Sequence, residues 1–309
     1  MALFHVSPQQ PKNGFETMEG SYVGMTSSDG FYLEFFGFNR RPFTLLPDPG
    51  FMYWSPLHKR GYSVLQFGVM TCAPITVLSG EIGAGKTTLI QHLLSELEPT
   101  ITVGLVSNAQ GGRGELLQWV LNALGVPVED GAGYVKMFQT LQDFLVAEYA
   151  KGRRVVLIFD EAQNLTVEGL EEVRMLTNIN SNTDELIQLI LVGQPELRDL
   201  ILDPKMRQLT QRVAASFHLA RMDAETVENY IRHRLKTAGG TGQEFDKAAC
   251  KRVYEQTRGV PRLVNQFCDF ALLYAWTNET HKVDEHIVDL VIEDGVFFGG
   301  NSLEKELTV

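Results

Sequence analysis

The segment of this 309-residue chain best suited to chemistry is a glycine-rich stretch that ends in a lysine and two threonines. Residues 80–88 satisfy the pattern G-x-x-x-x-G-K-[ST] at every required position. A short β-branched run at residues 75–78 precedes the stretch, and leucines and an isoleucine at helical spacing follow it. Strand, glycine loop and helix N-terminus together surround phosphate oxygens with backbone N–H groups. We therefore predict a nucleoside triphosphate site, the alternative being a simple glycine-rich turn.

Two residues of this loop have assignable chemistry. Lys86 would neutralise the β- and γ-phosphates, and the hydroxyl of Thr87 would bind Mg²⁺. Glycines let the backbone wrap the phosphates without Cβ clashes. The predicted nucleotide-binding residues are Gly80, Glu81, Ile82, Gly83, Ala84, Gly85, Lys86, Thr87 and Thr88.

An acidic pair follows a second apolar run. Residues 154–159 read Arg-Val-Val-Leu-Ile-Phe and end at Asp160 and Glu161. Carboxylates at the C-terminal end of a parallel strand face the crevice in which α/β proteins bind ligands. Asp160 would hold Mg²⁺, and Glu161 would polarise the water that attacks the γ-phosphate, which favours hydrolysis over transfer to a small acceptor. The alternative is an acidic pair that opens the next helix.

Composition limits the class of protein. The 44% hydrophobic and 21% charged content is typical of a folded soluble protein, and the net charge of −11 would repel phosphate backbones. Cys72, Cys250 and Cys268 lie far apart without metal-ligand spacing, which indicates reduced thiols. Neither a membrane-spanning apolar run nor a secretion signal is evident. We predict a cytoplasmic protein.

The pattern of apolar residues predicts strands that alternate with helices, followed by helices alone. This pattern is typical of an α/β fold with a five-stranded parallel sheet and right-handed crossovers, followed by an all-helical lid. The expected strands are residues 75–78, 101–106, 155–159, 186–192 and 217–219; the expected helices are 57–70, 87–97, 116–124, 134–150 and 170–179, then 226–238, 246–258, 262–277 and 284–293.

The same pattern divides the chain into four parts. Residues 1–30 are expected to form a flexible arm and residues 31–222 an α/β nucleotide-binding domain. Residues 223–294 would form the helical lid, and residues 295–309 a mobile tail. The aromatic-rich stretch near residues 32–68 is interpreted as a packed cap and not as a surface that stacks nucleic-acid bases.

Three sets of motifs now carry a resemblance to a known family. Residues 259–265, Gly-Val-Pro-Arg-Leu-Val-Asn, resemble the sensor-2 motif of AAA+ ATPases in the clade shared with origin-recognition proteins. Residues 191–197 resemble the sensor-1 region of the general secretion pathway A (ExeA-type) ATPases, and the motifs at 32–38, 41–43, 47–49 and 53–58 are similar to that family's opening. The resemblance covers residues 32–290. Members of the family commonly continue into a membrane span and a peptidoglycan-binding region, which this sequence lacks, so it resembles the shorter soluble members associated with exopolysaccharide or exosortase systems.

The resemblance implies roles for several further residues. Arg262 would reach the γ-phosphate from the lid, and Gln194 would orient the attacking water; the alternatives are a surface arginine and a turn glutamine. Arg212 resembles the arginine finger that a neighbouring subunit supplies, with Arg207 as the competing choice. Two further expectations are that Asn108 holds Glu161 away from water in a resting state and that His58 lines the adenine pocket, unless it is a buried structural histidine.

These expectations together describe an AAA+ ATPase that uses ATP and Mg²⁺ at the subunit interfaces of a homo-oligomer. Its partner would be a secretion or polysaccharide-export system at the inner membrane, which the protein would approach only through that partner. One alternative is a DNA-binding regulator like the transposition ATPases, and another is a nucleotide-gated scaffold with negligible turnover. The DNA-binding alternative depends on a cluster of basic residues: Lys151, Arg153, Arg154, Lys205, Arg207 and Arg212.

Overall fold

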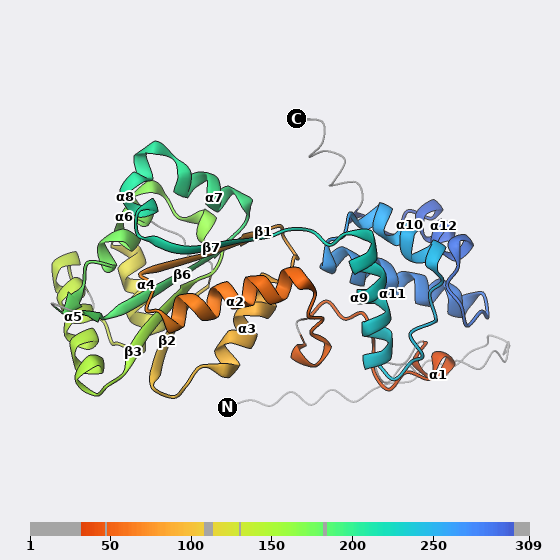
Figure 1. The fold of residues 1–309 in the computed structure, drawn as a ribbon, viewed down its shortest axis with the longest axis horizontal. Helices are drawn as coiled ribbons and strands as arrows, with labels where there is room; N and C mark the ends of the chain where they lie inside the picture. The colour runs from red at the N-terminus through yellow and green to blue at the C-terminus, as the bar shows by residue number, and fades with distance from the viewer. Residues whose placement is uncertain (1–31, 47, 108–113, 130, 182–183, 300–309) are drawn as a thin grey trace, which may run out of the picture.

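An α/β region and a helical region lie side by side along the long axis of the molecule (Figure 1). The computed structural model describes residues 32–46, 48–107, 114–129, 131–181 and 184–299. The predicted arm at 1–30, Asn108 and most of the predicted tail lie outside these residues.

The α/β region is built on five parallel strands in the order β2-β3-β6-β1-β7, which confirms the predicted sheet. The strands are β1 (Ile75–Gly80), β2 (Ile101–Val106), β3 (Arg154–Phe159), β6 (Ile187–Gly193) and β7 (Val213–Leu219). Every residue of β1 and β6 is buried, as expected for strands covered on both faces. Because all five strands are parallel, the loops after β1, β3 and β6 meet at one edge of the sheet.

Alternate residues of each central strand enter different cores. In β3, Val156 and Ile158 pack with α2 (Pro56–Met70) and α3 (Lys86–Glu96), which are seen together on one face in Figure 1. Leu157 and Phe159 pack on the opposite face, against α4 (Glu115–Ala123), α5 (Tyr134–Ala150), α6 (Val167–Leu176) and α7 (Pro195–Leu202). The alternation of side chains along each buried strand therefore separates the two layers of helices.

The C-terminal region is helical, as predicted. It contains α9 (Ala224–Thr237), α10 (Lys247–Thr257), α11 (Pro261–Thr277) and α12 (Glu285–Glu293). Aspartates cap three of these helices by accepting a hydrogen bond from a backbone N–H in the first turn, and α11 instead begins at a proline. None of the helices in the described part of the chain is long and apolar enough to span a membrane.

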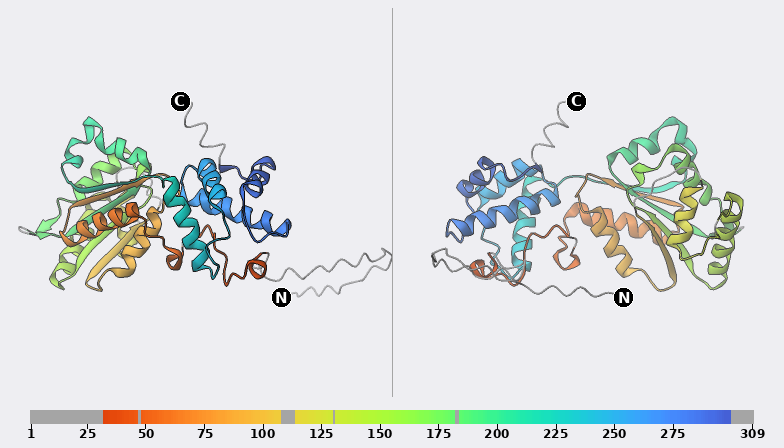
Figure 2. Two further views of the ribbon diagram at one scale, coloured as in Figure 1. Left: turned by 45° about the vertical axis from the view of Figure 1, so that its right-hand side comes forward. Right: turned by 180° about the vertical axis from the view of Figure 1, so that it is seen from behind.

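The aromatic-rich N-terminal segment packs mainly against the helical region (Figure 2). It includes the short helix α1 (Leu33–Phe36) and the 3-10 turn η1 (Pro49–Phe51). Four of its aromatic side chains are buried, as a packed cap requires, but they belong to the core formed by α9–α12: Tyr32, Phe38, Phe43 and Phe51. Farther along the segment, Met52, Trp54 and Leu57 pack against the α/β core, and η1 also contacts α3. The cap therefore joins the two regions.

Some elements do not follow from the sequence pattern. After β6 the chain forms α7, then a 3-10 turn η3 (Pro204–Met206) and the short helix α8 (Arg207–Thr210), none of which was expected. After α6 the chain forms a pair of two-residue strands, β4 (Asn180–Ser181) and β5 (Asp184–Glu185), which the pattern did not predict either. These short elements bring Arg207 and Arg212 to the start of β7.

Candidate active site

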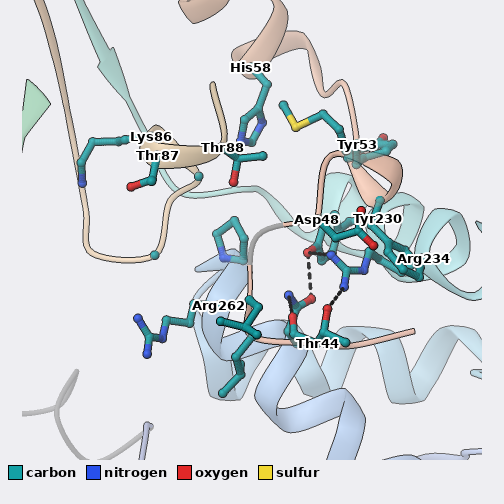
Figure 3. A pocket seen from close by; sticks show the side chains of 18 of the residues that line it. Thr44, Asp48, Tyr53, His58, Lys86, Thr87, Thr88, Tyr230, Arg234 and Arg262 are labelled. Carbon is teal, nitrogen blue, oxygen red and sulfur yellow. Dashed lines mark hydrogen bonds between the residues drawn. The ribbon is translucent and has the colours of Figure 1, made fainter. Parts of the chain in front are cut away.

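A cavity of about 240 Å³ lies where the glycine loop faces the helical region (Figure 3). One side of the cavity is the predicted phosphate loop, including Lys86, Thr87 and Thr88, together with Glu161. The other side comes from the N-terminal segment and from α9 and α11. The cavity therefore has a phosphate-loop side and a side built by residues far away in sequence.

Two glycines of the loop adopt a backbone conformation that other residues rarely take. Gly83 has φ +76° and Gly85 has φ +100°. A Cβ atom on Gly83 would lie 2.5 Å from Cβ of Arg262, and one on Gly85 would lie 2.9 Å from Nε2 of His58. Side chains at these positions would fill the space through which the loop approaches the helical region and His58. At position 85, which the motif fixes as glycine, both the left-handed backbone and the nearby ring of His58 disfavour any larger residue.

Lys86 begins α3, and its side chain is buried against the loop. Its Nζ atom donates to the carbonyl oxygens of Gly80 at 2.6 Å and Glu81 at 2.9 Å. Burial lowers the pKa of Lys86, while the negative charges of Glu161 and Asp160 act in the opposite direction. The predicted phosphate-binding cation and the predicted acidic pair therefore lie close enough to interact.

The acidic pair lies directly after β3. Asp160 accepts a hydrogen bond from the backbone N–H of Glu161 at 3.0 Å, and Glu161 has the left-handed backbone angle φ +54°. Such a conformation costs a non-glycine residue about 1–3 kcal/mol and is found at functional sites. Burial raises the pKa of Asp160, and the charge of Glu161 raises it further. A bound cation would favour the charged carboxylate at this position.

The carboxylate of Glu161 is held by two glutamines. Nε2 of Gln194 donates to Oε2 of Glu161 at 3.1 Å, and Nε2 of Gln163 donates to the same oxygen at 2.6 Å. The sequence reasoning singled out Gln194 but missed Gln163. The sequence offered one indication of its role: Gln163 lies only two residues after Glu161.

Arg262 lies at the first turn of α11, beside the loop. Its backbone N–H donates to the carbonyl oxygen of Gly83 at 3.3 Å, and its exposed side chain lines the cavity (Figure 3). The structure therefore brings this arginine to the loop from the helical region.

His58 also lines the cavity, but both of its ring nitrogens have protein partners. Nε2 donates to the carbonyl oxygen of Ala84 at 3.1 Å, and Nδ1 accepts from the hydroxyl of Ser55 at 2.7 Å. Burial lowers the pKa of His58, which favours the neutral ring. Its position fits both earlier interpretations, and its contacts show that it supports the loop.

A polar network closes the end of the cavity away from the loop, and the sequence reasoning missed it. Tyr230 donates to Oδ1 of Asn265 at 2.7 Å, and Nδ2 of Asn265 donates to the carbonyl oxygen of Thr44 at 3.1 Å. Arg234 is buried, donates through Nε to the carbonyl oxygen of Pro42 at 2.6 Å, and lies over the ring of Phe51. The only sequence signal was that Tyr230 and Arg234 lie four residues apart on one helix face.

The two candidate arginine fingers lie elsewhere. Arg212 precedes β7 and donates to Oδ1 of Asn178 at 2.8 Å, and Arg207 is exposed at the start of α8. Neither is among the described residues that line the cavity. The structure thus brings together the loop, Asp160, Glu161, Gln194 and Arg262, but not Arg207 or Arg212.

Three of the basic residues on which the DNA-binding alternative depends are engaged within the chain. Lys151 and Arg153 both bind the buried carboxylate of Glu148. Arg154 donates to the carbonyl oxygen of Val69 and to the sulfur of Cys72. Arg154 is also the first residue of β3, so it lies at the opposite end of that strand from Asp160. These contacts weaken the case for a free basic cluster.

Comparison with known proteins agrees with this geometry. Residues 71–201 match a family model described as an AAA domain. Over 252 residues the chain is 34% identical to general secretion pathway protein A of Aeromonas hydrophila. The matched region is an AAA+ ATPase of the general secretion pathway A (ExeA) type. The match covers 82% of this chain but only 46% of the Aeromonas protein, so the chain spans less than half of the length of that relative.

Solved structures support the fold of this ExeA-type chain. The ORC2 protein of Aeropyrum pernix, solved in ADPNP-ADP complexes, superposes with a TM-score of 0.57 at 16% identity over 79% of this chain and 71% of its own. Cdc6p of Pyrobaculum aerophilum gives a TM-score of 0.58 at 16% identity over 77% of this chain and 68% of its own. At this level of identity the comparison concerns the fold alone.

Proposed function

We propose that this protein hydrolyses ATP to ADP and phosphate in the cavity between the glycine loop and the helical region. The observation that carries the proposal is the convergence of three predicted groups on one place: the loop, Lys86 and the acidic pair after β3. Burial removes water from the Lys86 amine and so disfavours its charged form. An anionic ligand beside the amine would stabilise the charged form again.

The donors near the loop fit a magnesium ion. Thr87 offers a hydroxyl and Asp160 a carboxylate, which are the hard oxygen ligands that Mg²⁺ prefers. Burial raises the pKa of Asp160, and a bound cation would oppose this shift by stabilising the charged carboxylate. When bound, the ion would neutralise charge on the phosphates. Lys86 and the backbone N–H groups of the loop would hold the phosphate oxygens.

Hydrolysis needs a base beside the γ-phosphate. Glu161 lines the cavity and, in this proposal, accepts a proton from the attacking water. Gln194, which contacts Glu161, orients the same water. Arg262 reaches the γ-phosphate from α11, so that the angle between the two regions follows the state of the nucleotide.

The proposal extends to an assembly of identical subunits. Arg212 lies outside the cavity described for its own chain, as a residue that acts on a neighbour's nucleotide must. In a homo-oligomer it would neutralise charge in the transition state of the adjacent subunit, with Arg207 as the competing candidate. The free energy of hydrolysis would drive a conformational change in a secretion or polysaccharide-export partner at the inner membrane. The protein would reach that membrane from the cytoplasm through its partner.

Phosphate release from ATP tests the reaction. We expect steady turnover by the wild-type protein, no ATP binding by Lys86→Ala, and ATP binding with scarcely any turnover by Glu161→Gln. Turnover of Glu161→Gln at the wild-type rate would show that Glu161 is not the base. A folded wild-type protein that binds ATP without releasing phosphate would instead indicate the nucleotide-gated scaffold.

Mixed assemblies test the interface. A subunit carrying Arg212→Ala keeps its loop, and one carrying Lys86→Ala keeps its arginine, so an equimolar mixture should recover part of the activity that each lacks alone. Parallel mixtures with Arg207→Ala distinguish the two candidates. Oligomers that form without any recovery would exclude Arg212 as the finger.

A further inference from the structure

The carboxylate of Glu161 is tied to the end of β6 through a residue to which no role has yet been given. We propose that Gln163 is a positioning residue that fixes Glu161 toward the cavity and couples it to Gln194. This inference rests on the proposed ATPase function and concerns how its base is held. Gln163 would act through Glu161 without contacting the nucleotide.

The hydrogen bonds form a closed arrangement of three residues. Both Gln163 and Gln194 donate through Nε2 to one oxygen, Oε2 of Glu161. The backbone N–H of Gln194 in turn donates to Oε1 of Gln163 at 3.0 Å. The amide of Gln163 thus uses one end to hold the base and the other to hold the backbone after β6.

This arrangement leaves Glu161 facing the cavity, not turned away from it. Glu161 is one of the residues that line the cavity, and its second oxygen, Oε1, is not part of the amide network. A carboxylate that is held in place before the reaction loses less freedom when the reaction occurs. The network therefore supports a positioning role for Gln163. The restraint expected of Asn108 stays a prediction, because Asn108 lies outside the described residues.

The position of Gln163 is itself fixed by its surroundings. It belongs to the 3-10 turn η2 (Ala162–Asn164), in which Ala162 is fully buried and accepts a hydrogen bond from the N–H of Leu165. Gly193 supplies the space that the amide needs, because a Cβ atom there would lie 2.8 Å from Oε1 of Gln163. The last residue of β6 is thus adapted to Gln163, and a movement of β6 or α7 would reach Glu161 through this contact.

Substitution by methionine keeps the length of the side chain and removes both of its hydrogen bonds. We expect Gln163→Met to lower kcat about 10-fold or more, the loss typical of one hydrogen bond to a charged group, with KM and the dissociation constant for ATP nearly unchanged. The matched control is Gln142→Met, at an exposed position on α5 outside the site, where kcat should stay at the wild-type value.

The background of Glu161→Gln separates positioning from a general structural defect. If Gln163 acts through Glu161, adding Gln163→Met to Glu161→Gln should cause no further loss in single-turnover hydrolysis. An equal loss in both backgrounds, or a loss accompanied by a lower Tm and a weaker affinity for ATP, would overturn the inference in favour of a structural role. An unchanged or increased kcat of Gln163→Met would also overturn it, while leaving the proposed function intact. Wild-type protein that binds ATP without hydrolysing it would overturn both.

Discussion

The two sides of the cavity are built in different ways. On the loop side, Lys86 and the glycines belong to one continuous stretch between β1 and α3, and Asp160 and Glu161 directly follow β3. On the far side, Thr44, Tyr230, Arg234 and Asn265 come from three segments separated by up to 221 residues and meet only when the N-terminal segment packs on α9 and α11.

A short motif can encode only one side of such a cavity. The phosphate side needs a backbone shape and a few charges that local sequence determines. The far side needs long-range packing, including the cation–π contact of Arg234 with Phe51 and the contact between Gly259 and the chain that enters α9. Substitutions of the buried residues on the far side should therefore reduce the stability of the fold, whereas those on the loop side should reduce function at nearly constant stability.

The largest expected effect is at the junction of the two regions. Gly259 has φ +75°, and a Cβ atom there would lie 1.9 Å from the carbonyl oxygen of Met222. We expect Gly259→Ala to lower the free energy of unfolding by about 3 kcal/mol or more, measured by urea denaturation. Gly295→Ala is the matched control, because Gly295 has φ +62° but no atoms within 4 Å, so it isolates the backbone strain, about 1–2 kcal/mol. Equal losses at the two sites would mean that the junction is not tightly packed.

The next effect concerns the buried arginine of the far side. Arg234→Met removes the donor to Pro42 and leaves a buried carbonyl oxygen without this partner, so we expect a loss of about 2 kcal/mol in the free energy of unfolding. Arg232→Met, two residues earlier on α9, removes partly exposed hydrogen bonds to Glu228, to the carbonyl oxygen of Gly242 and to Gln243. It should cost less than Arg234→Met, because water can replace these donors. If both variants denature at the same urea concentration, the long-range network does not stabilise the far side as described.

A smaller, pH-dependent effect is expected at a local cluster of the α/β region. Hydrogen bonds from Arg153, then Thr102 and Lys151, lower the pKa of the buried Glu148 carboxyl to about 2. Because the folded value lies below the ordinary value of 4.5, the stabilisation is complete above pH 4.5 and is lost as the pH falls toward about 2. Glu148→Gln should therefore have a lower Tm than wild type at pH 7, with the difference shrinking below pH 4.5. A difference that stays constant over this range would contradict the assignment.

The smallest effect on stability is expected at Arg262, whose side chain is exposed. We expect Arg262→Ala to change the free energy of unfolding by less than about 0.5 kcal/mol while lowering kcat/KM for ATP. Lys247→Ala, an exposed position on α10 away from the cavity, removes the same charge and should leave both quantities unchanged. Wild-type kinetics of Arg262→Ala would show that the arginine is only a surface residue, which was the alternative interpretation of its motif.

The loop side of the cavity could be predicted from the sequence, whereas the far side could not. The five strands could be predicted because they are short apolar runs, and most of the longer helices because their apolar residues recur with a period of 3.6. The loop could be predicted because its glycines and lysine have fixed spacing. Helix α7 was missed because it follows a motif interpreted only for its chemistry. Gln163 and the Arg234 network were missed because neither has a local pattern. Each depends on a partner that the fold brings near, such as Gly193 or Thr44.

Isothermal titration calorimetry with ATP and Mg²⁺ shows whether the glycine loop binds a nucleotide, on which every proposed role depends. We expect saturable heat from the wild-type protein and none from folded Lys86→Ala under the same conditions. Absence of heat from well-folded wild-type protein, as monomer and as oligomer, or equal binding by Lys86→Ala, would contradict this expectation.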